Sequence, residues 1–225
     1  MKNILLTGDS KGLGENIKRK LLDSGYNVIG LSRSSCDIQY DLSNVDGIKN
    51  LYLEIIKERG PIHGYINNAA FAYDDIITNL NSDRLMEMYK VNVFSPMMLT
   101  KYVIRDMMLN KTHGSIVHIS SISVHTGYKG LAMYASTKGS LEAFSKNTSR
   151  EWGRMGIRSN IVCPGFMDTD MSSSLNDDQR NKIFKRNSRQ KELTTEEVSS
   201  TVKFLISDES TGITGQIIHV DNGTI

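Results

Sequence analysis

A tyrosine and a lysine lie four positions apart in the stretch YASTK, at Tyr134 and Lys138, shortly after a serine-rich segment. On a helix this spacing brings the two side chains to the same face. An ammonium group one turn away favours the phenolate form and lowers the pKa of a phenol from its usual value of about 10. Such a tyrosine could act as a proton donor near neutral pH. The same five residues also fit an ordinary helix start with an exposed lysine, so the spacing alone does not decide between the two interpretations.

A glycine-rich turn with the sequence TGDSKGLG occupies residues 7–14, directly after an apolar run at 4–6. Glycines let a backbone approach a pyrophosphate closely, and a helix that begins there offers N–H groups and positive potential. Ordinary turns also need glycine, so the pattern by itself is weak. Between a strand and a helix, at the start of an alternating chain, it indicates a dinucleotide phosphate site.

The end of the second strand indicates which dinucleotide binds. An acidic residue there would accept hydrogen bonds from the adenosine ribose hydroxyls and favour NAD. Ser32 and Arg33 occupy this place instead, and Lys11 lies in the glycine turn. Two cations near the ribose suit a 2′-phosphate, although both could also be solvated surface charges. We favour NADP(H) over NAD(H) as the cofactor.

The order of elements predicts how these residues are positioned. Short apolar runs indicate buried strands, amphipathic stretches indicate helices, and the two alternate along the chain. This alternation predicts an α/β fold with a doubly wound parallel sheet of the Rossmann type, formed by one catalytic domain over residues 1–225. Strands are expected at 4–6, 27–32, 37–40, 64–67, 115–120, 157–163 and 215–220, and helices at 13–24, 44–59, 82–109, 134–155 and 194–207.

Two places depart from a regular pattern. Only residues 33–36 separate the second and third strands, whereas a parallel crossover normally needs a dozen or more residues. Either the crossover is shortened by loss of its helix, or residues 37–40 do not form a regular strand. The long helix over 82–109 is expected to kink near Pro96.

The composition excludes several other classes of protein. Hydrophobic residues make up 39% and charged residues 23%, and the net charge of +2 gives no support for a nucleic-acid partner. No apolar run reaches the roughly 18–20 residues that span a bilayer, and the N-terminus lacks a signal-peptide cleavage site, so we expect a cytoplasmic protein without a membrane partner. Cys36 and Cys163 stand apart, and the histidines, His118 and His125 among them, have no cysteine or carboxylate partner at ligand spacing. We therefore expect reduced thiols and no metal site.

Several motifs occur in a fixed order along the chain: the glycine turn, Asn67-Asn-Ala-Ala70, Asn92, Ser121, YASTK, and a Pro-Gly-Phe-Met stretch from Pro164. Together they resemble the short-chain dehydrogenase/reductase family, over nearly the whole length. The stretches PGFMDTDM, SDES and ITGQ resemble its 3-oxoacyl-acyl-carrier-protein reductase type.

The resemblance implies a role for each matching residue. Tyr134 would be the proton donor, with Lys138 lowering its pKa and holding the nicotinamide ribose. Ser121, thirteen positions before Tyr134, would polarise the substrate carbonyl. Asn92 would anchor a water in a proton relay and kink the long helix, and Asn67 would line the cofactor path. The residues expected to bind the cofactor are Gly8, Ser10, Lys11, Gly12, Leu13, Gly14, Ser32, Arg33, Asp41, Leu42, Asn68, Ala69, Ala70, Tyr134, Lys138, Pro164, Gly165, Met167 and Thr169.

The implied activity is NADPH-dependent reduction of a ketone to a secondary alcohol, with a 3-oxoacyl thioester as the nearest candidate substrate. The run before the fifth strand, NKTH, is only thinly basic for docking an acidic carrier, so a small polar ketone such as a keto-sugar stays open. A catalytically silent dinucleotide-binding redox sensor is a third alternative, which the presence of both Tyr134 and Lys138 disfavours. The resemblance also implies a homo-oligomer, a tetramer or a dimer, formed through the two long helices.

Overall fold

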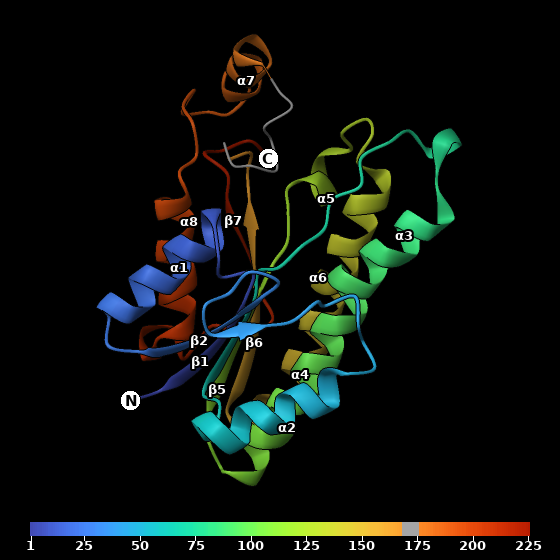
Figure 1. Ribbon diagram of the computed structural model, residues 1–225. Helices are drawn as coiled ribbons and strands as arrows, with labels where there is room; N and C mark the ends of the chain where they lie inside the picture. The colour runs from blue at the N-terminus through green and yellow to red at the C-terminus, as the bar shows by residue number, and fades with distance from the viewer. Residues whose placement is uncertain (168–175) are drawn as a thin grey trace.

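The computed structural model describes residues 1–167 and 176–225. Within these residues, the centre is a sheet of seven parallel strands in the order β3-β2-β1-β4-β5-β6-β7 (Figure 1). The chain builds outward from β1 to β3, then returns to the other side of β1 and continues from β4 to β7. This reversal confirms the doubly wound sheet of a Rossmann fold. The strands are β1 (Asn3–Thr7), β2 (Asn27–Ser32), β3 (Ile38–Gln39), β4 (Gly64–Asn67), β5 (Gly114–Ile119), β6 (Ile157–Pro164) and β7 (Ile217–Val220).

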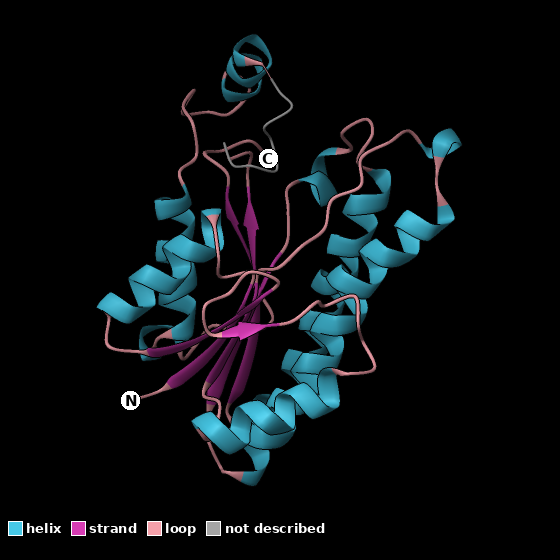
Figure 2. Cartoon of the chain, in the orientation of Figure 1, coloured by secondary structure: helices cyan, strands magenta, loops and turns pink. Residues whose placement is uncertain are grey.

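Helices cover both faces of the sheet (Figure 2). One face carries α1 (Gly12–Asp23) and α8 (Thr195–Ile206), and the other carries α2 (Ile48–Arg59), α4 (Ser95–Leu109) and α6 (Ala132–Trp152). Beyond the carboxyl end of the sheet, α7 (Asp177–Phe184) lies on the same side of the molecule as the C-terminus. The shorter elements are α3 (Ser82–Tyr89), α5 (Ser123–Thr126) and the 3-10 turns Ile77–Asn79, Gly153–Met155 and Asp208–Ser210.

Alternating side chains of the central strands fill two separate cores. Leu5 of β1 packs with α2 and α4, whereas Ile4 and Leu6 pack with α1 and α8. Successive strand side chains point to opposite faces, so a strand covered on both faces must be apolar at nearly every position. This explains the unbroken apolar run at 4–6, where burying each side chain contributes about 1.5–3 kcal/mol.

The start of α8 follows its local signal. Thr194 and Glu197 form a capping box, in which Glu197 N donates to Thr194 Oγ1 at 3.2 Å and Thr194 N donates to Glu197 Oε2 at 3.0 Å. The box satisfies two N–H groups that the first helical turn leaves without partners. The last turn of α1 ends just before Gly25, whose φ of +82° suits a glycine at a helix end and agrees with the expected helix over 13–24.

The predicted helix over 82–109 is interrupted. A π-helical turn (Lys90–Phe94) separates α3 from α4, and Ser95 N donates there to the Lys90 carbonyl, five residues back. Pro96 has no N–H to donate to the carbonyl of Asn92, so the regular α pattern cannot run through this point. The helix is thus interrupted close to the expected position, in the turn that precedes the proline.

The short connection after β2 combines both expected alternatives. Residues 33–37 form a loop without a helix, and β3 is only two residues long, with Leu31 paired to Ile38 and Ser32 to Gln39. The loop therefore returns to the carboxyl end of β2 instead of crossing over a full strand. Among the described helices, none is long and apolar enough to cross a membrane.

Candidate active site

The glycine turn after β1 forms a tight cradle. Gly8 adopts a φ of +71°, and a Cβ placed on Gly14 would lie only 1.8 Å from the Gly8 carbonyl oxygen. Lys11 occupies the N-cap position of α1, and a lysine side chain has no oxygen to accept a bond from the first-turn N–H groups. These groups are left for a ligand, so the turn has the form of an anion-binding helix start. Gly12 begins the helix, and Leu13 packs into the core beneath it.

Asn68 holds this cradle in place. Its Nδ2 donates to the carbonyl oxygens of Thr7 at 3.2 Å and Gly8 at 2.9 Å. The backbone N–H groups of Asn68 and Ala69 both donate to Thr7 Oγ1, at 3.1 and 3.2 Å. The Asn68 amide is thus committed to the turn, and Ala69 and the half-buried Ala70 follow beside it. Thr7 is a supporting residue that sequence reasoning missed.

The loop after β2 closes over the same turn. Ser34 Oγ donates to Ser10 Oγ at 3.0 Å, which links the loop to the glycine turn. The hydroxyl of Ser32 is buried and has no hydrogen-bond partner in the described part of the chain. Arg33 is exposed beside it. The structure therefore brings the predicted ribose-binding residues to the edge of the cradle.

Asp41 and Leu42 lie farther along the same segment. The Ser43 N–H, which donates to Asp41 Oδ1 at 2.8 Å, lowers the pKa of this carboxyl, and the Arg33 charge acts in the same direction. The Leu42 side chain is buried in the core with α2, and its carbonyl accepts a hydrogen bond from Ser95 Oγ. Leu42 would thus face a ligand only through its backbone.

An ion-pair network beneath the cradle was not predicted. Lys18 Nζ lies 2.8 Å from Asp9 Oδ2 and 2.8 Å from Asp37 Oδ2, and Asp37 also accepts from the Gly30 N–H at 2.8 Å. Asp9 is buried and accepts a further bond from Ser35 Oγ at 2.9 Å. These bonds join the glycine turn, α1 and the short loop after β2. Nothing in the local sequence pattern signals them, because the partners are far apart in the chain.

Of three neighbouring serines after β5, Ser121 is the one placed for a ligand. Ser120 is buried and donates to Glu142 Oε1 at 2.5 Å. Ser123 is also buried, whereas Ser121 is half-buried and its Oγ accepts only from the Ser123 N–H, at 3.2 Å, among the bonds described. A hydroxyl that accepts in this way keeps its proton available for a substrate oxygen.

Tyr134 and Lys138 lie together on the first two turns of α6. The Lys138 Nζ is 5.6 Å from the centre of the Tyr134 ring and donates to the Ile119 carbonyl at 2.9 Å. Lys138 is only 2% exposed, which is unusual for a lysine. The predicted pairing of these two side chains is therefore present, at the end of β5 and close to Ser121.

The electrostatics of this pair differ from the expectation. In the chain alone, burial raises the pKa of Tyr134, and the charge of Asp74 acts in the same direction. Burial also lowers the pKa of Lys138, to about 8. The spacing predicts a lowered tyrosine pKa, but it does not reveal that both groups lose water, which disfavours both charged forms.

Asn92 connects the π-helical turn to the Tyr134–Lys138 segment. It is 1% exposed in the π-helical turn, where its Oδ1 accepts from Phe71 N and its Nδ2 donates to Phe71 O, both at 2.8 Å. Nδ2 also donates to Thr137 Oγ1 at 3.0 Å, next to Lys138. The side chain is therefore a brace, and the Asn92 backbone carbonyl cannot accept the usual helical bond from position 96, because proline has no N–H.

The end of β6 lies at the same carboxyl edge of the sheet. Pro164 is the last residue of the strand, and a Cβ on Gly165 would lie 2.8 Å from the Asp221 Cα, so the chain passes close to the segment after β7. Met167 packs against the core that holds α1 and α8. The predicted contact from Thr169 lies outside the described residues.

The interpretation of the histidines requires one correction. His118 is a packing residue, as expected: its ring makes edge contacts with Tyr65 and Phe144, and burial lowers its pKa to about 3. His125, however, has both a cysteine and a carboxylate close by, from Cys163 and Glu142. The sequence could not show this, because Cys163 is 38 positions after His125.

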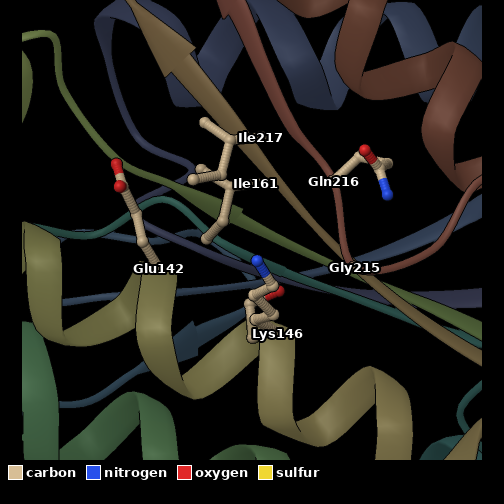
Figure 3. A pocket seen from close by; sticks show the side chains of 7 residues that line it. Glu142, Lys146, Ile161, Gly215, Gln216 and Ile217 are labelled. Atoms are coloured by element: carbon tan, nitrogen blue, oxygen red, sulfur yellow. The ribbon is translucent and has the colours of Figure 1, made fainter.

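A separate hollow of about 230 Å³ lies between α6 and the strands β6 and β7 (Figure 3). Glu142 and Lys146 project from α6 at its border, with Ile161 and Ile217 of the two strands beside them. Its described lining contains none of the four predicted catalytic residues. The hollow is therefore distinct from the cradle and from the Tyr134–Lys138 pair.

Comparisons with known proteins agree with this architecture. A family described as "Enoyl-(Acyl carrier protein) reductase" matches residues 9–224. The 3-oxoacyl-[acyl-carrier-protein] reductase of Escherichia coli (strain K12) is 33% identical, across 99% of this chain and 96% of the relative. The protein of that name from Buchnera aphidicola subsp. Acyrthosiphon pisum is 33% identical, across 97% and 95%, and the one from Vibrio cholerae is 31% identical, across 99% and 96%. The chain therefore belongs to the short-chain dehydrogenase/reductase family, as an NAD(P)-dependent oxidoreductase similar to 3-oxoacyl-[acyl-carrier-protein] reductases.

Proposed function

We propose that this chain uses NADPH to reduce the ketone of a 3-oxoacyl thioester to a secondary alcohol, with Tyr134 as the proton donor. The observation that carries the proposal is the buried ammonium group of Lys138, 5.6 Å from the Tyr134 ring centre. A buried lysine is costly unless the site uses its charge. Here it lies where a carbonyl oxygen would gain negative charge during reduction.

The residues present fit a nicotinamide dinucleotide. Gly8 and Gly14 let the turn, α1 and the Asn68 segment pack closely against one another, and the start of α1 offers N–H groups to a pyrophosphate. The buried Ser32 hydroxyl lacks a partner among the described residues, and a ribose or phosphate oxygen would supply one. When bound, this cofactor supplies the hydride that adds to the carbonyl carbon.

The adenosine end of the cradle favours the phosphorylated cofactor. Lys11 and Arg33 lie on the two segments that Ser10 and Ser34 link, so both cations border the same place. A guanidinium group suits a phosphate better than a ribose hydroxyl. Asp41 lies near enough to Arg33 for the two charges to interact, and it would offset part of this preference.

In the proposed reaction, Ser121, Tyr134 and Lys138 each act on the substrate oxygen, on the proton that it receives or on the phenolate that remains. Ser121 Oγ donates a hydrogen bond to the substrate carbonyl oxygen and holds it beside Tyr134. As hydride addition builds alkoxide charge, the Tyr134 hydroxyl gives its proton to that oxygen, and Lys138 stabilises the phenolate that remains. Asn92 keeps the Lys138 segment in place through Thr137, and its carbonyl holds a water through which the proton is replaced.

The names of the relatives support a 3-oxoacyl thioester as substrate. All three act, by name, on an acyl group carried by the acyl carrier protein. Several cations lie on or just after α7, beyond the carboxyl end of the sheet, where an acidic carrier would dock: Lys182, Lys185, Arg186 and Arg189. A small polar ketone is the alternative, because the segment before β5 supplies only a thin positive charge.

The proposal extends to the setting of the protein. We place one catalytic domain over residues 1–225, in the cytoplasm, as a homo-oligomer formed through the α3–α4 and α6 helices. Met86 and Phe94 are large apolar side chains exposed near the α3–α4 junction, which supports an interface there.

Replacing Tyr134 by phenylalanine tests the reaction and the substrate separately. Wild type should oxidise NADPH with a short 3-oxoacyl thioester, and Tyr134→Phe should lose about 100-fold or more in kcat while keeping most of its affinity for NADPH. Tyr26→Phe, at a half-buried tyrosine on the opposite face, is the matched control and should keep full turnover.

The other outcomes lead to different conclusions. Undiminished turnover by Tyr134→Phe would refute the mechanism. Reduction of keto-sugars without reduction of the thioester would replace the substrate class and keep the reaction. NADPH binding without turnover of either substrate class would favour the redox-sensor alternative.

A further inference from the structure

Three side chains with metal-binding atoms converge at the ends of β6 and β7. The ligand atoms of His125, Cys163 and His219 all lie within 4.8 Å of one another. Cys163 pairs with His219 in the parallel register of the two strands, so their side chains share one face of the sheet. His125 comes from α5, and its ring lies 5.0 Å from the ring of His219, centre to centre, at 81°. Three separate elements thus supply the cluster.

The cluster lies between an apolar core and a polar rim, since Cys163 packs with Ile122 and Leu141 beneath the two histidines. Cys163 is 0% exposed and forms its floor, whereas His125 and His219 are exposed at its rim. A carboxylate completes the group, because His125 Nε2 lies 3.2 Å from Glu142. Glu142 is itself held by the Ser120 hydroxyl at 2.5 Å. The cluster is therefore accessible on one side and braced on the other.

We propose that His125, Cys163 and His219 bind one zinc-like divalent cation, with Glu142 or a water as the fourth ligand. One thiolate with two imidazoles is a donor set that Zn²⁺ favours, in tetrahedral geometry. In such a site neighbouring ligand atoms lie about 3.5 Å apart, as bond lengths of 2.0–2.3 Å require. In the structure the ligand atoms lie up to 4.8 Å apart. The two exposed imidazoles can shorten these distances by rotating, while Cys163 stays fixed on β6.

Binding would exchange a proton for the metal. The S–H bond of Cys163 breaks as the metal–sulfur bond forms, and the proton leaves to solvent. A bound cation would also tie α5, which follows Ser121, to the two strands.

The simpler explanation is that the cluster consists of packing contacts alone. His125 then pairs with Glu142 and stacks edge-on against His219, and Cys163 is an inert buried thiol. The two explanations differ in a measurable way. Packing predicts no stoichiometric cation binding, whereas a metal site predicts binding that each of the three side chains controls.

Zinc titration of the full chain against a chromophoric chelator tests the proposal. Wild type should bind one Zn²⁺ per chain. The variants His125→Gln and His219→Gln, at the two exposed histidines, should each bind Zn²⁺ at least tenfold more weakly. Cys163→Ala should lose the thiolate-to-metal absorption band that Co²⁺ gives with wild type. His113→Gln, at a histidine remote from the cluster beside Met155, is the matched control and should bind as wild type does.

Thermal unfolding supplies a second measurement that does not depend on activity. Excess Zn²⁺ should raise the Tm of wild type and of His113→Gln, and should raise the Tm of His219→Gln by clearly less. Equal zinc affinity in wild type and His219→Gln would overturn the proposal. So would the absence of binding to wild type at micromolar Zn²⁺.

Discussion

Gly14→Ala should destabilise the chain, because the added methyl group has no space. The new Cβ would lie 1.8 Å from the Gly8 carbonyl oxygen and 2.7 Å from Asn68 Nδ2. Nonbonded heavy atoms need about 3.5 Å, so α1 and the glycine turn would have to separate by well over 1 Å. Both contacts involve backbone or an anchored amide, and neither can yield as the end of a flexible side chain would.

The expected size of this effect follows from two costs. Overpacking of this kind costs about 1–3 kcal/mol, and stretching the 2.9 Å bond from Asn68 Nδ2 to the Gly8 carbonyl adds about 1 kcal/mol. We expect a total loss of about 2–4 kcal/mol in the free energy of unfolding, which lowers Tm by roughly 4–16 °C in a chain of this size. The distorted cradle should also weaken dinucleotide binding.

A second glycine in a helix provides the control. A Cβ on Gly139 in α6 would meet Val124 Cγ1 at 3.5 Å, an ordinary contact. Gly139→Ala should therefore stabilise the chain by about 0.5–1 kcal/mol through helix propensity. Urea unfolding of wild type and both variants should give shifts of opposite sign. A loss below about 0.5 kcal/mol for Gly14→Ala would refute the rigid cradle, because the overpacking cost requires more.

Three further predictions concern charged groups. Lys18→Met should lower the free energy of unfolding in urea by about 3 kcal/mol, because it leaves Asp9 buried without its cation. Lys2→Met breaks an exposed ion pair and should lower it by less than about 1 kcal/mol. Equal losses in the two variants would contradict this reasoning. The pKa of Lys138 is lowered to about 8 from 10.5, so the fold penalises its charge below pH 8. Wild type should therefore gain stability relative to Lys138→Met as pH rises from 8 to 10.5. A difference in unfolding free energy that does not change with pH would show that the lysine is not desolvated. Arg33→Ala should raise the Kd for NADPH about tenfold and leave that for NADH unchanged, measured by fluorescence titration, and equal losses for both would remove the 2′-phosphate argument.

Much of the fold could be predicted because its signals are local. Runs such as 4–6 are apolar at every position because helices cover both faces of the sheet, and this pattern is visible without any tertiary information. The capping box of α8 and the stop at Gly25 are likewise local. The helix over 82–109 was predicted as one element because its apolar pattern continues through the π-helical turn, which only the missing N–H of Pro96 signals.

The site residues could also be predicted where their signal is local, and could not where it depends on long-range contacts. Short motifs contain the glycine turn, Ser121, Tyr134 and Lys138. Parallel strands bring such motifs together at the carboxyl edge of the sheet. The bonds that hold them could not be predicted, since Asp9 meets Asp37 through Lys18, and Thr7 meets Asn68, only after the chain has folded. His125, Cys163 and His219 are the extreme case, because no spacing rule joins positions 38 and 56 residues apart.

The raised pKa of Tyr134 bears on the proposed direction of reaction. With its pKa raised by burial, Tyr134 holds its proton at neutral pH, while Lys138, at about 8, is still mostly charged. A neutral phenol beside an ammonium group is the charge state that a ketone reductase needs before hydride addition. The alkoxide that forms is a far stronger base than a phenolate, so it takes the proton even from a phenol of raised pKa. The phenolate that remains then faces Lys138, in surroundings where burial strengthens their attraction. The desolvation that opposes the sequence expectation is therefore compatible with the proposed role of Tyr134 as a proton donor, because it keeps the phenol protonated before hydride addition.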